Sequence, residues 1–402
     1  MREVRAPSHV DSLARLLVRF GANVQPGQVV GLGTEPGKEA LARAVAAEAY
    51  RAGAKFVDVQ CFDVHIKRAR ALYADPATLA YVPPWVGERV LALGRLRGAM
   101  IVLTSPTDPH LMDGIDPELL GRDMLPHVKE SSVVLEERTV NWTIGPCPTA
   151  DWAALAYPEL GPEEALERLW SEIATICRLD EPDPVAAWER RMARLQQVAA
   201  ALDRLQLDRL RYEGPGTNLT VGLLPGSRWQ AARLRTLDGV LHAANIPTEE
   251  VFTTPDPERA EGVVSATRPL FSSGVLIEGL RMRFEEGRAV EIEAERNAGT
   301  LRALTERDPG GIRLGEVALV DCESRVGQRR RVFFETLLDE NAASHIALGQ
   351  GFPWAVAGED RRRVNRSEVH VDFMIGSEEL AVTGVTGAGE EVPLLRDGRF
   401  QL

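Results

Sequence analysis

The sequence predicts an α/β fold, with an N-terminal α/β domain followed by a mixed α+β domain in the second half of the chain. Two features carry this prediction. Short apolar runs alternate with segments of helical periodicity in the first half, which is typical of β-α-β units. In the second half, short apolar runs punctuated by Gly and Pro dominate instead. The length of 402 residues is that of two or three domains of ordinary size.

The N-terminal domain is expected to begin with a helix over residues 9–20, because leucines and Phe20 recur there at helical spacing. A β-α-β unit follows, in which an Ala-rich helix separates two strands. The strand, helix and strand of this unit are predicted at 27–33, 37–53 and 55–59. Further strands are predicted at 99–104, 133–135 and 139–144.

Two helical segments are predicted to connect the halves of the chain. Residues 162–207 carry two apolar stripes at helical spacing, separated by the break Glu-Pro-Asp-Pro at 181–184. The short strands that follow are predicted at 210–213, 219–222, 274–280 and 316–320. We therefore expect one domain over residues 1–207 and a second domain over residues 208–402.

Charge and hydropathy exclude several classes of protein. The formal net charge of −12 argues against a general nucleic-acid binder, which needs a basic face. The N-terminus has no signal-peptide hydrophobic run, and no apolar run is long enough to span a bilayer. We therefore expect a cytoplasmic protein without nucleic-acid or membrane partners.

Cysteine usage agrees with this compartment. The four cysteines lie far apart and form no C-x-x-C pair. A thiolate zinc site and a disulfide framework are both unexpected, which fits a reducing cytoplasm. Arginines far outnumber lysines, a composition compatible with a thermophilic source.

Residues 31–38 (GLGTEPGK) follow a strand and precede a helix, as a phosphate-binding loop does. They do not match G-x-x-x-x-G-K-[ST], because Leu32 occupies the first glycine position and Glu39 replaces the Ser or Thr. They do not match G-x-G-x-x-G either, because Pro36 occupies the third glycine position. We interpret the segment as a plain β-α turn.

Residues 369–376 (VHVDFMIG) are the most informative stretch of the chain. On a strand, His370 and Asp372 project from the same face, about 7 Å apart, while the apolar residues between them face the other way. One interpretation is a half-buried strand with a polar outer face. The other is a pair of ligands for a divalent metal.

Carboxylates occur in two other unusual settings of the second half. Glu249 and Glu250 lie between a proline and an apolar pair, and on an extended backbone they face opposite sides. They suit two different roles, or else a charged surface turn. Glu316 begins an otherwise apolar strand, where a carboxylate is either solvated or a ligand.

A second histidine follows an acidic segment. His345 is expected on a short helix that Asn341 caps and that Gly349 or Gly351 ends, and a histidine there is either structural, exposed or a ligand. The loop 363–367 leads directly into the strand of His370.

Metal binding accounts for these residues together. Two imidazoles with three or four carboxylates suit zinc, cobalt or manganese and also tolerate magnesium. So many anionic ligands exceed the needs of one zinc ion. They suit two divalent cations about 3.5–4 Å apart, which share a bridging carboxylate and a water that loses a proton near neutral pH. Such sites hydrolyse amides or phosphate esters.

The segments that carry these residues resemble the motifs of the thermophilic metallo-aminopeptidases (aminopeptidase T type, peptidase family M29), in the same order. The similar segments are 247–253 (PTEEVFT), 313–320 (RLGEVALV), 339–349 (DENAASHIALG), 365–367 (NRS) and 370–376 (HVDFMIG). Weaker similarity extends over most of the chain, including 214–220 (GPGTNLT).

The resemblance implies a cytosolic, homodimeric metallo-exopeptidase that releases N-terminal residues from peptides at a two-metal site in the C-terminal domain. The family's ligand positions fall on Glu250, Glu316, His345, His370 and Asp372, and Glu340 is a sixth candidate ligand. By analogy with other two-metal aminopeptidases, Glu249 is the candidate general base.

The sequence departs from the family pattern at Phe352. The family usually has a Tyr at this position, seven residues after His345, and its hydroxyl assists at the metal centre. Phenylalanine cannot donate a hydrogen bond, and losing a transition-state donor costs about 10²–10³ in rate. The last tyrosine of the chain is Tyr212, so no substitute is evident. The loop before Asn365 is also shorter than usual.

Three hypotheses follow from this pattern. The first is a metal-dependent aminopeptidase. The second is a related two-metal hydrolase whose substrate has changed with Phe352. The third is a homologue that binds metal or peptide without turnover, although intact ligand positions argue against it.

Overall fold

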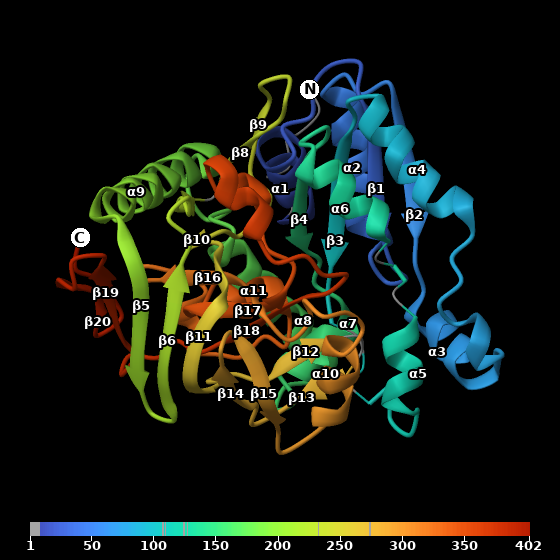
Figure 1. The fold of residues 1–402 in the computed structure, drawn as a ribbon. Helices are drawn as coiled ribbons and strands as arrows, with labels where there is room; N and C mark the ends of the chain where they lie inside the picture. Colours follow the sequence, from blue (N-terminus) through green and yellow to red (C-terminus); the bar gives the residue numbers. More distant parts are fainter. Residues whose placement is uncertain are drawn as a thin grey trace.

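The computed structural model describes residues 9–106, 108, 110–123, 125–126, 128–231, 233–272 and 275–402. Its first half contains a parallel sheet of four strands in the order β2-β1-β3-β4. The strands are β1 (Val29–Thr34), β2 (Phe56–Cys61), β3 (Ala99–Thr104) and β4 (Asn141–Pro146). Figure 1 shows this sheet with its helices beside the larger, strand-rich half. The predicted β-α-β unit is thus confirmed.

The helices of the first half are the two predicted at 9–20 and 37–53 and several others that the sequence pattern did not predict. They are α1 (His9–Leu16), continued by a π-helical turn (Leu17–Gly21), α2 (Glu39–Arg51), α3 (Val64–Tyr73), α4 (Pro84–Arg95), α5 (Pro117–Arg122), α6 (Lys129–Glu136) and α7 (Ala150–Ala156). The strand predicted at 133–135 is wrong, because these residues belong to α6. Val134 is buried beside α4 while Val133 is exposed, so one helical face rather than a strand covers the core.

Two long helices, α8 (Pro162–Ile176) and α9 (Pro184–Leu205), lead into the second half. Each begins with a proline at its first turn, where the missing N–H costs nothing. Their apolar stripes are buried, as the periodicity predicts, and Arg191 lies within the buried stripe of α9. In Figure 1, α9 crosses the upper end of the strands of the second half.

The second half contains two large antiparallel sheets. The sheet of eight strands has the order β15-β14-β11-β6-β5-β19-β20-β21, and the sheet of five strands has the order β18-β17-β16-β10-β7. The first comprises β5 (Leu207–Gly214), β6 (Thr217–Leu223), β11 (Pro255–Ser265), β14 (Arg281–Glu285), β15 (Arg288–Glu293), β19 (Ala381–Thr386), β20 (Glu391–Arg396) and β21 (Arg399–Phe400). The second comprises β7 (Gln230–Ala231), β10 (Glu250–Thr253), β16 (Leu314–Val320), β17 (His345–Gly349) and β18 (His370–Met374).

Smaller elements complete the second half. Two hairpins pair β8 (Leu234–Arg235) with β9 (Leu241–His242) and β12 (Leu270–Ser272) with β13 (Val275–Ile277). The helices are α10 (Ala298–Thr305), α11 (Thr336–Glu340) and the 3-10 turns η3 (Gly327–Arg329), η4 (Pro353–Ala355) and η5 (Gly358–Arg363). The predicted strand 274–280 corresponds to β13, and Gly274 lies outside the described residues. Within the described part of the chain, no helix is both long and apolar enough to traverse a bilayer.

The placement of His345 on a helix is a second wrong prediction. Helix α11 ends at Glu340, Asn341 follows its last turn, and His345 begins strand β17. Every residue of β17 is buried, and β16 and β18 pair with it on both sides. This pairing outweighs the helix propensity of its Ala and Leu residues.

The two halves share backbone hydrogen bonds and a core. The N–H of Ile144 on β4 donates to the carbonyl of Ala244 at 2.8 Å, and the N–H of Ile246 donates back to the Ile144 carbonyl at 2.9 Å. The segment that leads into β10 therefore lies against the edge of the parallel sheet. One continuous cluster of buried apolar residues extends from Leu17 through Trp188 to Val317.

Candidate metal centre

The five-stranded sheet brings the predicted ligands to one face. Glu316 on β16 is opposite Ala347 on β17, which in turn is opposite Asp372 on β18, so these three side chains form one row across the sheet. His345 is two residues from Ala347, and His370 is two residues from Asp372, so both imidazoles project from the same face. Ala347 is small, and it leaves space between the two carboxylates that flank it.

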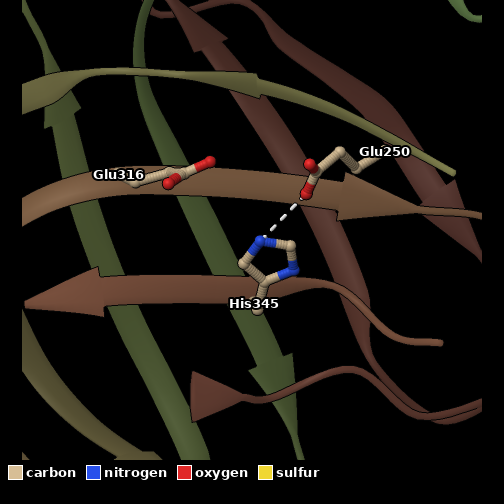
Figure 2. A group of neighbouring side chains, drawn as sticks. All are labelled: Glu250, Glu316 and His345. Carbon is tan, nitrogen blue, oxygen red and sulfur yellow. Dashed lines mark ion pairs between the residues drawn. The ribbon is translucent and has the colours of Figure 1, made fainter. Parts of the chain in front are cut away.

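Glu316 is shared by two groups of candidate ligands. Glu250, Glu316 and His345 each offer one ligand atom, and these atoms all lie within 4.8 Å of one another. Glu316, His370 and Asp372 form a second group with the same limit. Figure 2 shows the first group, in which side chains from β10, β16 and β17 point toward one another. Each group combines one imidazole with two carboxylates.

Hydrogen bonds to the backbone orient both imidazoles. Nδ1 of His345 lies 3.2 Å from the carbonyl oxygen of Ala343, and Nδ1 of His370 lies 2.8 Å from that of Gln350. A carbonyl oxygen only accepts, so we assign a proton to each Nδ1. The Nε2 atoms then face the carboxylates, which is the usual arrangement of histidines that bind metals.

The Nε2 atoms lie close to carboxylate oxygens. His345 Nε2 is 3.0 Å from Glu250 Oε2, and His370 Nε2 is 3.2 Å from Glu316 Oε2 and 3.4 Å from Asp372 Oδ1. The first contact lacks the alignment of a hydrogen bond, and Glu250 Oε2 is buried without a hydrogen-bond partner among the described residues. A nitrogen lone pair facing a carboxylate needs a proton or a cation between them, so this donor set fits divalent metal.

The charges of the centre shift its pKa values strongly. Burial raises the pKa of Glu316 to about 7, and the Asp372 and Glu250 carboxylates add to this rise against the opposing effect of His370. Burial lowers the pKa of His345, but the Glu250 and Asp372 carboxylates outweigh it and raise the pKa well above the ordinary value. The centre therefore holds extra protons at neutral pH, and these must leave when cations bind.

Glu340 lies beside the two groups without belonging to either. Its carboxyl is at the end of α11, where the amides of Asn341 and Asn245 donate to Oε1 at 3.4 and 3.5 Å. Burial raises the pKa of Glu340 well above its ordinary value, and the Asp372 and Glu250 carboxylates raise it further. It is thus part of the same electrostatic environment.

Glu249 points away from its neighbour Glu250, as the extended backbone predicts. Its carboxylate is fully buried and lies 2.7 Å from Arg178 Nη1 and 2.6 Å from Arg191 Nε. Asn341 Oδ1 accepts the N–H of Glu249 at 2.6 Å. The structure thus places this carboxylate between two arginines rather than against the candidate ligands.

Sequence reasoning missed the arginines behind the centre. Arg191 also contacts Asp321 at 2.7 Å and Glu323 at 3.2 Å, and Arg178 lies 4.0 Å above the ring of Trp188. The available signal was an arginine inside the apolar stripe of α9, since a buried guanidinium needs carboxylate partners.

Aromatic rings border the other side of the centre. The ring centroid of Phe352 lies 5.3 Å from that of His370, 5.5 Å from that of Phe252 and 5.1 Å from that of Trp354. The loop that carries Phe352 is anchored by Thr254, whose hydroxyl accepts the Phe352 N–H at 2.9 Å. The ring at position 352 is thus a neighbour of the candidate ligand His370.

Two groups of carboxylates and imidazoles on one sheet face, joined by a shared Glu, are the pattern of a metalloprotein; the first group is buried and the second reaches the surface at His370. A family model for thermophilic metalloproteases (M29) matches residues 7–400. Aminopeptidase T of Thermus thermophilus is 41% identical over 402 residues, covering 98% of each chain. Aminopeptidase PepS of Streptococcus thermophilus is 36% identical, covering 97% of each chain. The chain therefore belongs to the thermophilic metalloprotease family M29.

Solved structures agree with this assignment. Wild-type AmpT from Thermus thermophilus superimposes with a TM-score of 0.88 at 40% identity, covering 98% of this chain and 99% of that one. A 2,5-dihydroxypyridine dioxygenase from Pseudomonas putida has a TM-score of 0.50 at 14% identity, which shows a shared fold alone. The predicted α/β architecture is confirmed.

Proposed function

We propose that the chain is a metal-dependent aminopeptidase whose two divalent cations are held by Glu250, Glu316, His345, His370 and Asp372, with Glu340 as a sixth candidate ligand. The observation that carries this proposal is the pair of ligand groups that share Glu316. Relatives over the full length are named aminopeptidases, so the alternatives of an altered substrate or a binding protein without turnover are not favoured. One imidazole and two carboxylates in each group suit zinc, cobalt or manganese, and magnesium less well.

In this centre the cations and the protein side chains have different chemical roles. When bound, the cations lower the pKa of a water and polarise the scissile carbonyl. His345 and His370 are held in a fixed orientation by the carbonyls of Ala343 and Gln350, so the ligands need no rearrangement during turnover. Water has restricted access, because Glu250, Glu316 and His345 are almost fully buried.

A carboxylate must carry the proton of the attacking water to the leaving amine. Our sequence-based candidate was Glu249. We propose a positioning role for it instead, because both of its oxygens face arginines and its backbone adjoins the ligand Glu250. Glu340 can take this role in place of a ligand role, because it lies beside the ligand groups and its described contacts are two long ones with amides.

The activity is tested with the metal-loaded full-length protein. Aminoacyl-p-nitroanilides and short peptides should release their N-terminal residues one after another, while the same peptides with an acetylated α-amino group should remain intact. A folded protein that contains metal and cleaves neither kind of substrate contradicts the proposal. Cleavage of the acetylated peptides contradicts the assignment as an exopeptidase.

The variant Phe352→Tyr should raise kcat on peptides by about 10- to 100-fold, because a hydroxyl beside His370 adds a donor near the developing oxyanion. Steady-state kinetics on a dipeptide measure this effect. Phe252→Tyr adds the same hydroxyl to a neighbouring ring of the cluster and serves as the matched control. An unchanged kcat in Phe352→Tyr would mean that the reaction at this centre does not use such a donor.

We also propose that the enzyme is a cytoplasmic homodimer. The four cysteines are free, which suits a reducing compartment. Several large apolar side chains of the first half are exposed, including Phe56, Tyr73 and Trp85, and such surfaces often mark contacts between subunits. Peptides are the substrates, and the acidic net charge supports the absence of a nucleic-acid partner.

A further inference from the structure

A pocket lies between the two halves, and Trp354 of the aromatic cluster is part of its lining. Its volume is about 210 Å³. Residues on and near α6 and β4 line one side, and residues on and near the β8–β9 hairpin line the other. Its charged and aromatic lining residues are Arg138, Trp142, Arg233, Arg235, His242 and Trp354.

Three arginines of this pocket have no carboxylate partner. Within the described ranges, no carboxylate oxygen lies within 4.0 Å of the guanidinium nitrogens of Arg138, Arg233 or Arg235. Arg233 is stacked 5.0 Å above the ring of Phe20, and its Nε is buried without a hydrogen-bond partner among the described residues. Burial lowers the pKa of Arg233, the more distant Glu189 carboxylate opposes this change, and the charge of Arg235 adds to it. In a chain of net charge −12, unpaired arginines gathered in one pocket indicate a site for an anion.

His242 supplies a second, independent sign of a ligand. Its side chain lines the pocket and is only 2% exposed, and neither ring nitrogen completes a hydrogen bond with any described residue. Burial lowers the pKa of His242 to about 4 against the opposing effect of the nearby Val240 backbone, so the ring is neutral and offers one N–H donor at neutral pH. A buried polar ring without a partner costs free energy unless a ligand or water satisfies it.

The aromatic cluster connects this pocket to the metal centre. Trp354 lines the pocket and stacks against Phe352 at 5.1 Å, and Phe352 in turn lies 5.3 Å from the ligand His370. An extended peptide advances about 3.3–3.6 Å per residue, so a chain of about three to four residues spans these two ring spacings. The row of rings thus gives a short extended peptide one path from the candidate ligand His370 to the pocket that Trp354 and the arginines line.

We propose that this pocket binds the C-terminal carboxylate of short peptide substrates and thereby selects oligopeptides of about three to four residues. The proposal rests on the aminopeptidase function proposed above. Guanidinium groups donate paired hydrogen bonds to a carboxylate, and the N–H of His242 supplies a further donor. Trp142 and Trp354 provide apolar walls for the last side chain of the peptide.

The test compares tripeptides and tetrapeptides that end in a free carboxylate with the same peptides ending in an amide. The wild-type enzyme should favour the acid by about 10- to 100-fold in kcat/KM, the range of a hydrogen bond to a charged group. In Arg233→Gln the ratio of acid to amide should fall toward one. Arg235→Gln, at an exposed position, tests the same point should Arg233→Gln fail to fold. Arg330→Gln, an exposed arginine paired with Glu378, is the matched control and should keep the ratio.

Calorimetry separates this inference from the proposed function. An N-acetylated tripeptide acid should bind the metal-loaded wild-type protein more tightly than its amide, and Arg233→Gln should abolish this difference even if no peptide is cleaved. Equal kcat/KM for acid and amide in an active wild-type enzyme overturns the carboxylate site and leaves the aminopeptidase function intact. Inorganic phosphate binding as tightly as the tripeptide acid also overturns it, because the pocket would then be a general anion site.

Discussion

Glu316→Gln is expected to lose bound divalent metal and to reduce aminopeptidase turnover by at least about 10³-fold. Glu316 is the only residue common to both ligand groups found in the described chain, so its replacement weakens both cation positions at once. Glutamine keeps the shape of the side chain but removes its negative charge. Metal content after dialysis, measured by atomic emission, and turnover of a p-nitroanilide substrate provide the two readouts.

Stability measurements show whether this loss comes from unfolding. Without cations, burial and neighbouring carboxylates raise the pKa of Glu316 to about 7, so ionised Glu316 is unfavourable in the metal-free protein. The metal-free variant should therefore melt at no lower temperature than the metal-free wild type. Glu378→Gln, which alters an exposed carboxylate, is the control and should retain metal and activity. Full metal content in Glu316→Gln would refute the shared-ligand assignment.

Arg191→Met is expected to lower the free energy of unfolding by about 3–5 kcal/mol. The variant removes the guanidinium that contacts Asp321 and one carboxylate oxygen of Glu249. Both carboxylates stay buried without this partner. Such an uncompensated charge is far more costly than the loss of an exposed ion pair. The midpoint of urea-induced unfolding, with its slope, measures the difference.

The neighbouring residue on the same helix provides the control for this variant. Arg190 is exposed and lies 4.0 Å from Glu181, so Arg190→Met should cost at most about 1 kcal/mol. Equal destabilisation by both variants would show that the loss reflects helix α9 in general and not the buried ion pairs. The double variant Arg191→Met with Glu249→Gln should recover part of the stability, since it removes one of the stranded charges.

Sequence periodicity predicted the helices and strands whose conformation depends mainly on residues close by in the sequence. In the β-α-β unit around α2 and in the strand of His370, the structure has the helix and strands that the sequence periodicity predicts. The helix predicted for His345 rests on Asn341 as a cap and on Gly349 or Gly351 as an end, and these are local signals. Only the pairing of β17 with two strands distant in sequence makes it a strand, and single-sequence periodicity does not contain that information.

The candidate site likewise has features that the sequence predicts and features that it does not. Residue chemistry and motif order identified the carboxylates and imidazoles that converge around Glu316. The opposite orientation of Glu249 and Glu250 was also predicted from the strand period. The partner of Glu249 was not, because Arg191 lies 58 residues away in sequence and nothing in its own helix identifies the carboxylate it meets. Roles that depend on such distant contacts require the three-dimensional structure.

The two hydrogen bonds between Ile144 and the segment before β10 have a thermodynamic consequence. They join the edge of the parallel sheet to a stretch that ends a few residues before Glu250. Local opening of that sheet edge is therefore expected to disturb the backbone that carries the candidate ligand Glu250. Cation binding at Glu250 is expected to stabilise the parallel sheet through the same hydrogen bonds. We therefore expect the two halves to unfold cooperatively, so that the free energy of metal binding also protects residues that never approach the ions.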